Sequence, residues 1–199
     1  AAVNGYDILK EGTEVKRITG LLAESPGLYE KLSAYEFLEF IGALYDVSSD
    51  VLSERIDDLL KLFGLYDRRD YLLEGYSRGM KQKILIASAL IHDPPILFLD
   101  EPTSMLDPRA ALMVKDLIKK LADTAGKTFF ICSHILPIVG ELCDRIGIIN
   151  QGRLIAVGTV DEIVAQTGTK TLEEAFIALT GGVEEKELLA WREQKGAHA

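Results

Sequence analysis

The sequence predicts an α/β fold in which a mainly parallel sheet is flanked by helices. Short runs rich in β-branched and aromatic residues alternate with longer runs that repeat apolar residues at helical spacing. The apolar run at 96–102, ILFLDEP, is typical of a strand that is buried on both faces of a parallel sheet. Between Leu22 and Glu74 no strand pattern occurs, so we expect a helical insertion beside the sheet.

The individual elements follow from this alternation and from helix-end signals. Two helices are predicted to begin at capping boxes, Ser33 with Glu36 and Thr171 with Glu174. Another helix, at about 51–63, ends where a glycine follows, because glycine accepts the left-handed conformation of a helix C-terminus. The predicted strands lie at 17–22, 95–100, 127–133 and 144–150.

The bulk composition excludes several classes of function. A formal net charge of -9 argues against unaided nucleic-acid binding, which requires clustered Lys and Arg. No apolar run is long enough for a membrane helix, so we expect any membrane to be reached through a partner. Both cysteines, Cys132 and Cys143, are interpreted as small core residues of a reducing compartment.

Two adjacent carboxylates, Asp100 and Glu101, end the predicted buried strand. Carboxylates at such a position are costly unless a cation compensates them, and Mg²⁺ is the simplest candidate. Asp100 would then hold the ion, while Glu101 would orient or deprotonate an attacking water. On this run alone, the alternative that both residues cap the following turn stays open.

Four further residues carry both a structural and a functional interpretation. Asp107 precedes a proline, as an N-cap does, and Ser77 with Gly79 opens another helix whose exposed amides suit a phosphate. His134 follows the predicted strand TFFIC, which brings an imidazole to the same sheet edge as Asp100. A lone histidine in such a place is more often structural than catalytic.

Taken in order, four motifs resemble those of the ATP-binding cassette (ABC) ATPases. They are YSRGMKQK (the family signature), ILFLDEP (Walker B with the catalytic glutamate), SMLD (the D-loop) and CSH (the switch histidine). The resemblance covers nearly the whole chain and implies a P-loop NTPase-like fold that binds ATP and Mg²⁺.

The resemblance also implies roles for single residues. Ser77 and Gly79 would contact the γ-phosphate of ATP bound to a second cassette, and Asp107 would lie at that dimer interface. His134 would contact the γ-phosphate in its own half, with Glu101 as the catalytic base.

Some positions depart from the family pattern. Arg78 and Met80 stand in the nucleotide-contacting signature where many members have glycine and glutamine. Glu24 takes the place of the Q-loop glutamine, where it would contact nucleotide and coordinate Mg²⁺. Together with 27–29 and 171–176, it resembles the ABC-2 type ATPases that drive exporters of drugs, ions or polysaccharides.

The phosphate loop GxxxxGK[ST] does not occur in the 199 residues. Gly126-Lys127-Thr128 has its last three letters but precedes a strand, so we interpret it as a turn. The resemblance places the loop and the first strands upstream of residue 1. We therefore expect these residues alone not to turn over ATP, and we expect the absent strand to leave an apolar slot.

The leading hypothesis is the ATP-hydrolysing subunit of a membrane exporter, acting as a dimer of cassettes (a homodimer in the simplest case) on a transmembrane permease. It would lie in the cytoplasm at the inner face of a prokaryotic cell membrane. The predicted domains are a truncated ATPase at 1–182, with a helical subdomain at about 29–90, and a helical tail at 183–199.

Two alternatives belong to other classes. A non-catalytic fragment would complete another subunit's ATP site or act as an interaction module. A DNA-repair cassette is disfavoured because the chain has no heptads and no paired cysteines.

Overall fold

The computed structural model describes residues 1–23 and 27–181. The predicted nucleotide and metal ligand Glu24 and the predicted tail at 183–199 lie outside the described residues.

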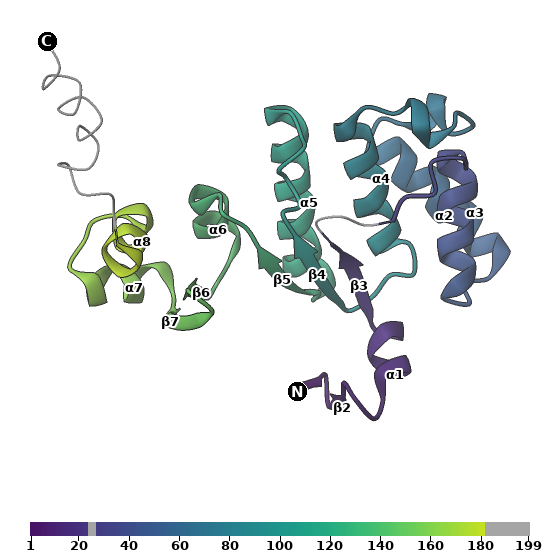
Figure 1. Cartoon of the computed structure of the whole chain (residues 1–199). Helices are drawn as coiled ribbons and strands as arrows, with labels where there is room; N and C mark the ends of the chain where they lie inside the picture. Colours follow the sequence, from purple (N-terminus) through teal and green to yellow (C-terminus); the bar gives the residue numbers. More distant parts are fainter. Residues whose placement is uncertain (24–26, 182–199) are drawn as a thin grey trace, which may run out of the picture. The chain divides into compact units, whose positions relative to one another are not determined.

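The chain forms two compact units, Ala1–His134 and a second unit that begins at Ile135 (Figure 1). The predicted domain at 1–182 and its helical subdomain at about 29–90 stay predictions.

A three-stranded parallel sheet organises the first unit. Its strands are β3 (Thr19–Leu22), β4 (Ile96–Asp100) and β5 (Thr128–Cys132), in the order β3-β4-β5. Both pairings are parallel, and the second ends with Asp100 opposite Cys132. The prediction of an α/β fold with a parallel sheet is confirmed, and three of its four expected strands form this sheet.

The two faces of the sheet differ in burial. Leu97 and Leu99 of β4 are buried on one face, whereas Leu21, Phe98 and Phe130 form a row on the other. In this row Leu21 is 64% exposed and Phe130 60% exposed. The expectation that β4 is buried on both faces is therefore wrong for the described residues.

Cys132 is exposed, which corrects its interpretation as a core residue. It belongs to β5, an outer strand of the three-stranded sheet, whose residues alternate between exposed and partly buried.

Helices and short turns fill the stretch between β3 and β4. The capping box is confirmed, because the Ser33 hydroxyl accepts from the Glu36 amide at 3.2 Å and the Glu36 carboxylate accepts from the Ser33 amide at 2.8 Å. Gly64 has a φ of +66°, which confirms the predicted helix end. The elements are α2 (Ala34–Leu44), α3 (Ser49–Leu62), η1 (Tyr66–Arg68), η2 (Leu73–Gly75) and α4 (Arg78–Leu90).

An aromatic stack connects α2 to the sheet. The rings of Tyr45, at the end of α2, and His92 lie 3.6 Å apart with an interplanar angle of 7°. The Nε2 atom of His92 lies 3.1 Å from the Thr19 carbonyl oxygen of β3, to which it donates. Burial between the helix and the strand lowers the pKa of His92, because it disfavours the charged form of the ring.

The chain before β3 and the helix between β4 and β5 complete the first unit. α4 packs on β3 and α5 on β5. The sequence did not predict the N-terminal elements. They are the antiparallel pair β1 (Ala2–Val3) and β2 (Tyr6–Asp7), and α1 (Gly12–Arg17), while α5 spans Pro108–Ala125.

The second unit is an antiparallel strand pair packed on helices. The predicted strand at 144–150 is present as β6 but pairs with β7, through a turn in which Gln151 and Gly152 both have positive φ. The predicted capping box at Thr171 is only half formed. The Thr171 hydroxyl accepts from the Glu174 amide, but the Glu174 carboxylate accepts from the Lys170 amide instead of the Thr171 amide. The elements are α6 (Leu136–Leu142), β6 (Ile146–Asn150), β7 (Arg153–Gly158), α7 (Val160–Thr167) and α8 (Leu172–Thr180).

We predict that Gly20→Ala destabilises the fold. A Cβ at Gly20 would lie 2.1 Å from the Ala89 carbonyl oxygen, so the close packing of β3 on α4 leaves no room for a methyl group. Overpacking of this kind costs about 1–3 kcal/mol. Urea unfolding should show a lower midpoint for G20A, whereas the control G75A, where no atom lies within 4 Å, should match the wild type. Equal midpoints for all three proteins would contradict this packing.

Candidate active site

Two strand ends bring together residues that are far apart in the sequence. Glu101 directly follows β4, and Ser133 and His134 directly follow β5. One Glu101 carboxylate oxygen, Oε1, accepts from the His134 backbone amide at 2.8 Å and lies 2.7 Å from the ring atom Nδ1. The other oxygen, Oε2, accepts from the Ser133 hydroxyl at 3.1 Å. Glu101 and His134 therefore form one site at the carboxyl edge of the sheet.

The hydrogen bonds orient this pair. Because the carboxylate accepts at Nδ1, that ring nitrogen carries a proton, and the Nε2 edge of His134 remains for another contact. The side chain of His134 is 78% exposed, whereas that of Glu101 is 17% exposed. A shielded carboxylate with a fixed direction and an exposed imidazole are groups suited to proton transfer and to anion contact.

The backbone of Glu101 adopts a conformation that is unfavourable for a residue with a side chain. Its φ is +47°, in the left-handed region, which costs about 1–3 kcal/mol. The amide of Glu101 donates to the Cys132 carbonyl at 2.9 Å, and its own carbonyl accepts from the Ser104 hydroxyl at 3.1 Å. These contacts hold the turn in place, and strain of this kind is concentrated at functional sites.

Asp100 fits the predicted role of a magnesium ligand. Within the described residues its carboxylate has no hydrogen-bond or ion-pair partner, and it lies at the strand end beside Glu101. No group of three or more His, Cys, Asp or Glu side chains that could hold a metal occurs in residues 1–23 and 27–181. Mg²⁺ is commonly bound by one or two carboxylates together with phosphate oxygens, so a single carboxylate is compatible with this ion.

The predicted signature residues form the first turn of α4. Ser77 is exposed and caps the helix by accepting from the Met80 amide at 3.3 Å. Arg78 is exposed, and Met80 is partly buried. Among the described residues no hydrogen bond joins this turn to Glu101 or His134, so the structure does not bring the two predicted groups into one site within the chain.

Gly79 lies against the loop that follows Glu101. A Cβ at Gly79 would be 3.1 Å from the Met105 carbonyl oxygen, which leaves little room for a side chain. The absence of a side chain at Gly79 thus permits the close approach of α4 to this loop.

Asp107 is the N-cap of α5, as its structural interpretation predicted. Its carboxylate accepts from the Ala110 amide at 2.9 Å, and this hydrogen bond is the main reason that the pKa of Asp107 is lowered. Its role at a dimer interface stays a prediction.

The sequence GKT at 126–128 is a turn, as expected. Gly126 ends α5 with a φ of +63°. The ammonium group of Lys127 donates to the Pro94 carbonyl at 2.7 Å, and its side chain is only 9% exposed. The Lys127 ammonium group is therefore bound within the fold, and the GKT segment does not form a phosphate loop.

Sequence reasoning gave no role to Ser133 and Gln82. The Gln82 side-chain amide donates to the carbonyl oxygens of Glu101 and Pro102, both at 3.3 Å. Ser133 could have been found because it follows β5 as Glu101 follows β4. Gln82 could have been found because it lies one helical turn after Gly79, on the same side of α4.

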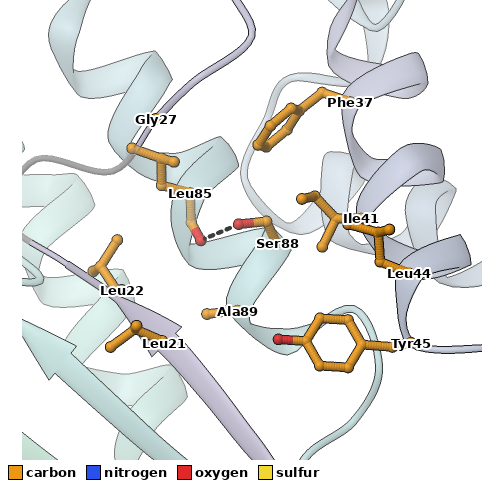
Figure 2. Close-up of a pocket in the computed structure, with 10 residues that line it drawn as sticks. All are labelled: Leu21, Leu22, Gly27, Phe37, Ile41, Leu44, Tyr45, Leu85, Ser88 and Ala89. Carbon is orange, nitrogen blue, oxygen red and sulfur yellow. Dashed lines mark hydrogen bonds between the residues drawn. The ribbon is translucent and has the colours of Figure 1, made fainter. Parts of the chain in front are cut away.

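An apolar pocket of about 230 Å³ lies between β3, α2 and α4 (Figure 2). The hydroxyl of Ser88 on its wall donates to the Leu85 carbonyl of the same helix at 2.8 Å. Among the described residues that line the pocket there is no cationic side chain that could attract a phosphate. The lining residues are Leu21, Leu22, Gly27, Phe37, Ile41, Leu44, Tyr45, Leu85, Ser88 and Ala89.

Comparison with known proteins shows the family to which the chain belongs. The sequence profile described as "ABC transporter" matches residues 2–104. The chain therefore belongs to the ABC transporter family, and the predicted family resemblance is confirmed.

Individual relatives support the same class. The chain is 36% identical over 190 residues to the linearmycin resistance ATP-binding protein LnrL of Bacillus subtilis, covering 96% of this chain and 60% of that protein. A solved ATP-binding subunit of an ABC transporter has a TM-score of 0.82 and 31% identity, over 89% of this chain and 75% of that one. A dimeric ATP-binding cassette bound to ADP and Pi, 24% identical over 79% of this chain and 70% of that one, has the same fold at a TM-score of 0.70. The chain spans about half the length of several curated relatives that it matches.

In the described part of the chain, every helix is too short or too polar to cross a membrane.

Proposed function

We propose that this chain is the ATP-binding and ATP-hydrolysing subunit of an ABC-type membrane exporter. The observation that carries the proposal is the Glu101–His134 pair, held at 2.7 Å beside Asp100 at the carboxyl edge of the sheet. The name of a relative that is 36% identical over 169 residues, a fluoroquinolones export ATP-binding protein of Mycobacterium tuberculosis, supports the assignment to export.

The mechanism follows from the directions of these groups. Glu101 would accept a proton from the attacking water, because its carboxylate is shielded and held by Ser133 and His134. With a proton on both ring nitrogens, His134 would donate from its exposed Nε2 edge to the γ-phosphate. Asp100 would hold Mg²⁺, which when bound neutralises charge on the phosphates.

Dimer closure would complete the site. Ser77 and Gly79 would contact ATP held by a second copy, since Ser77 is exposed at the amino end of a helix, where backbone amides attract anions. Asp107 would lie at the same interface, with Arg78 and Met80 beside it.

The transmembrane partner would bind the helical residues at about 29–62, on the inner face of the cell membrane. The apolar pocket and its exposed neighbours support this part of the proposal, because Tyr29 is 57% exposed and Leu44 64% exposed. The occupant that we propose is an apolar segment of the permease.

A second candidate is supported by a separate observation. The 199 residues contain no GxxxxGK[ST], while the signature turn is exposed. The chain would then complete the ATP site of another cassette without hydrolysing ATP itself. The coding sequence directly upstream distinguishes the candidates, because a GxxxxGK[ST] there supports catalysis and its absence from the gene would sink the catalytic proposal for this chain.

We predict that the 199 residues alone do not turn over ATP. Losing even three charge-assisted hydrogen bonds of a phosphate loop removes about 5–9 kcal/mol, comparable to the whole free energy of micromolar binding. We call a protein in which a GxxxxGK[ST] segment precedes residue 1 the extended protein. In a phosphate-release assay the extended protein should hydrolyse ATP, whereas the 199 residues alone should not. Turnover by the short chain would contradict the prediction, and an inactive extended protein would contradict the proposed function.

Glu101→Gln in the extended protein should leave ATP binding intact and lower turnover by at least about hundredfold, because the amide cannot accept the proton. Light scattering with ATP should then detect a stable dimer. The matched control is Glu14→Gln, a partly exposed glutamate of α1, which should behave as the wild type. Unchanged turnover of E101Q would refute the base role of Glu101.

Ser77→Arg should prevent the dimer that E101Q accumulates, because a long cation would replace a small hydroxyl at the closing surface. ATP binding to the separate subunit, measured by equilibrium dialysis, should persist. Ser48→Arg is the matched control, since Ser48 is the N-cap of α3 and makes no side-chain capping bond. Dimerisation of S77R/E101Q equal to that of S48R/E101Q would exclude Ser77 from the interface.

A further inference from the structure

The side chain of Gln82 connects α4 to the turn that carries Glu101. Its Nε2 group lies 3.3 Å from the carbonyl oxygen of Glu101 and 3.3 Å from that of Pro102. Both partners are acceptors only, so the NH₂ end of the amide must face the turn. Gln82 therefore donates hydrogen bonds to two consecutive carbonyl groups.

The turn that receives these bonds is the strained one. Glu101 has a φ of +47°, a conformation that lasts only where the surroundings determine it. The Cys132 carbonyl and the Ser104 hydroxyl hold the Glu101 backbone from β5 and from the turn itself. From α4, the side chain of Gln82 donates a hydrogen bond to the carbonyl oxygen of Glu101.

The same first turns of α4 touch the loop a second time. Gly79 lies against the Met105 carbonyl oxygen, at a distance that leaves little room for a side chain. Gln82 and Gly79 lie one helical turn apart and so face the loop together. Two contacts, one hydrogen-bonded and one close-packed, therefore join the amino-terminal turns of α4 to the loop that begins at Glu101.

We infer that Gln82 is a positioning residue that makes the Glu101 turn respond to the position of the signature helix. This inference rests on the proposed function, in which Ser77 and Gly79 of one subunit contact the ATP of its partner. Closure on the partner's ATP would then adjust Glu101 in the subunit's own site. Gln82 would link the two ATP sites of the dimer.

The test uses Gln82→Met in the extended protein, since methionine has a similar length but no N–H donor. We expect kcat to fall about tenfold through misplacement of Glu101, the KM for ATP to stay within about twofold, and the Hill coefficient for ATP to fall towards 1. The control is Gln166→Met, the same change at an exposed glutamine of α7. Q166M should keep the wild-type kcat and Hill coefficient.

A second variant separates positioning from folding. Gln82→Glu has the shape of the native side chain but donates a hydrogen bond only when its carboxyl is protonated. The ratio of its kcat to that of the wild type should rise as the pH falls from about 8 to about 5, because protonation restores the donor. A purely structural defect would leave this ratio independent of pH.

The outcomes distinguish the two levels of the proposal. If the wild type is active and Q82M has the same kcat and Hill coefficient, the role of Gln82 is overturned but the proposed function is not. A ratio of Q82E kcat to wild-type kcat that does not change with pH would have the same meaning. An extended wild-type protein without ATPase activity would overturn the proposed function and this inference together.

Discussion

The parallel pairing of β4 with β5 is the constraint on which the candidate site depends. Because Asp100 lies opposite Cys132, the residues that follow the two strands must meet, although they are more than thirty positions apart. The hydrogen bonds from Ser133 and His134 to Glu101 then stabilise a backbone conformation that a glutamate would otherwise avoid. The pairing of β4 with β5 thus places Glu101, supports its strained backbone and directs its carboxylate.

Around this pairing, α4 has two roles. It covers β3 so closely that Gly20 cannot carry a side chain, and its first turns meet the loop after Glu101 through Gly79 and Gln82. The helix that would bind the partner's nucleotide is therefore also the helix that donates hydrogen bonds to the turn at Glu101. This dual contact gives a physical reason why closure of the dimer and hydrolysis would be coupled.

The sequence predicted the parts of the fold that local patterns determine. The strand before Asp100, the capping box at Ser33 and the helix end at Gly64 were predicted correctly from local patterns, whereas the burial of β4 on both faces was not. Two features depended on more distant groups. The exposure of Cys132 follows from the outer position of β5 in the described sheet. The pairing of β6 with β7 depends on a tight turn at Gln151 and Gly152, which are not a standard hairpin dipeptide. Ser133 and Gln82 could have been selected from their places in the sequence, but their hydrogen-bond partners could not, since these depend on how two separate elements pack together.

The central claim is that Glu101 and His134 act as one unit, and a double-mutant cycle on single-turnover ATP hydrolysis tests it most directly. In the extended protein, E101Q, H134A and the double variant would be compared with the wild type. When two residues act together, the losses of rate caused by the two single substitutions do not multiply. The account therefore predicts that the double variant is no slower than the slower single variant. Multiplication of the two single effects would show independent roles and contradict the account.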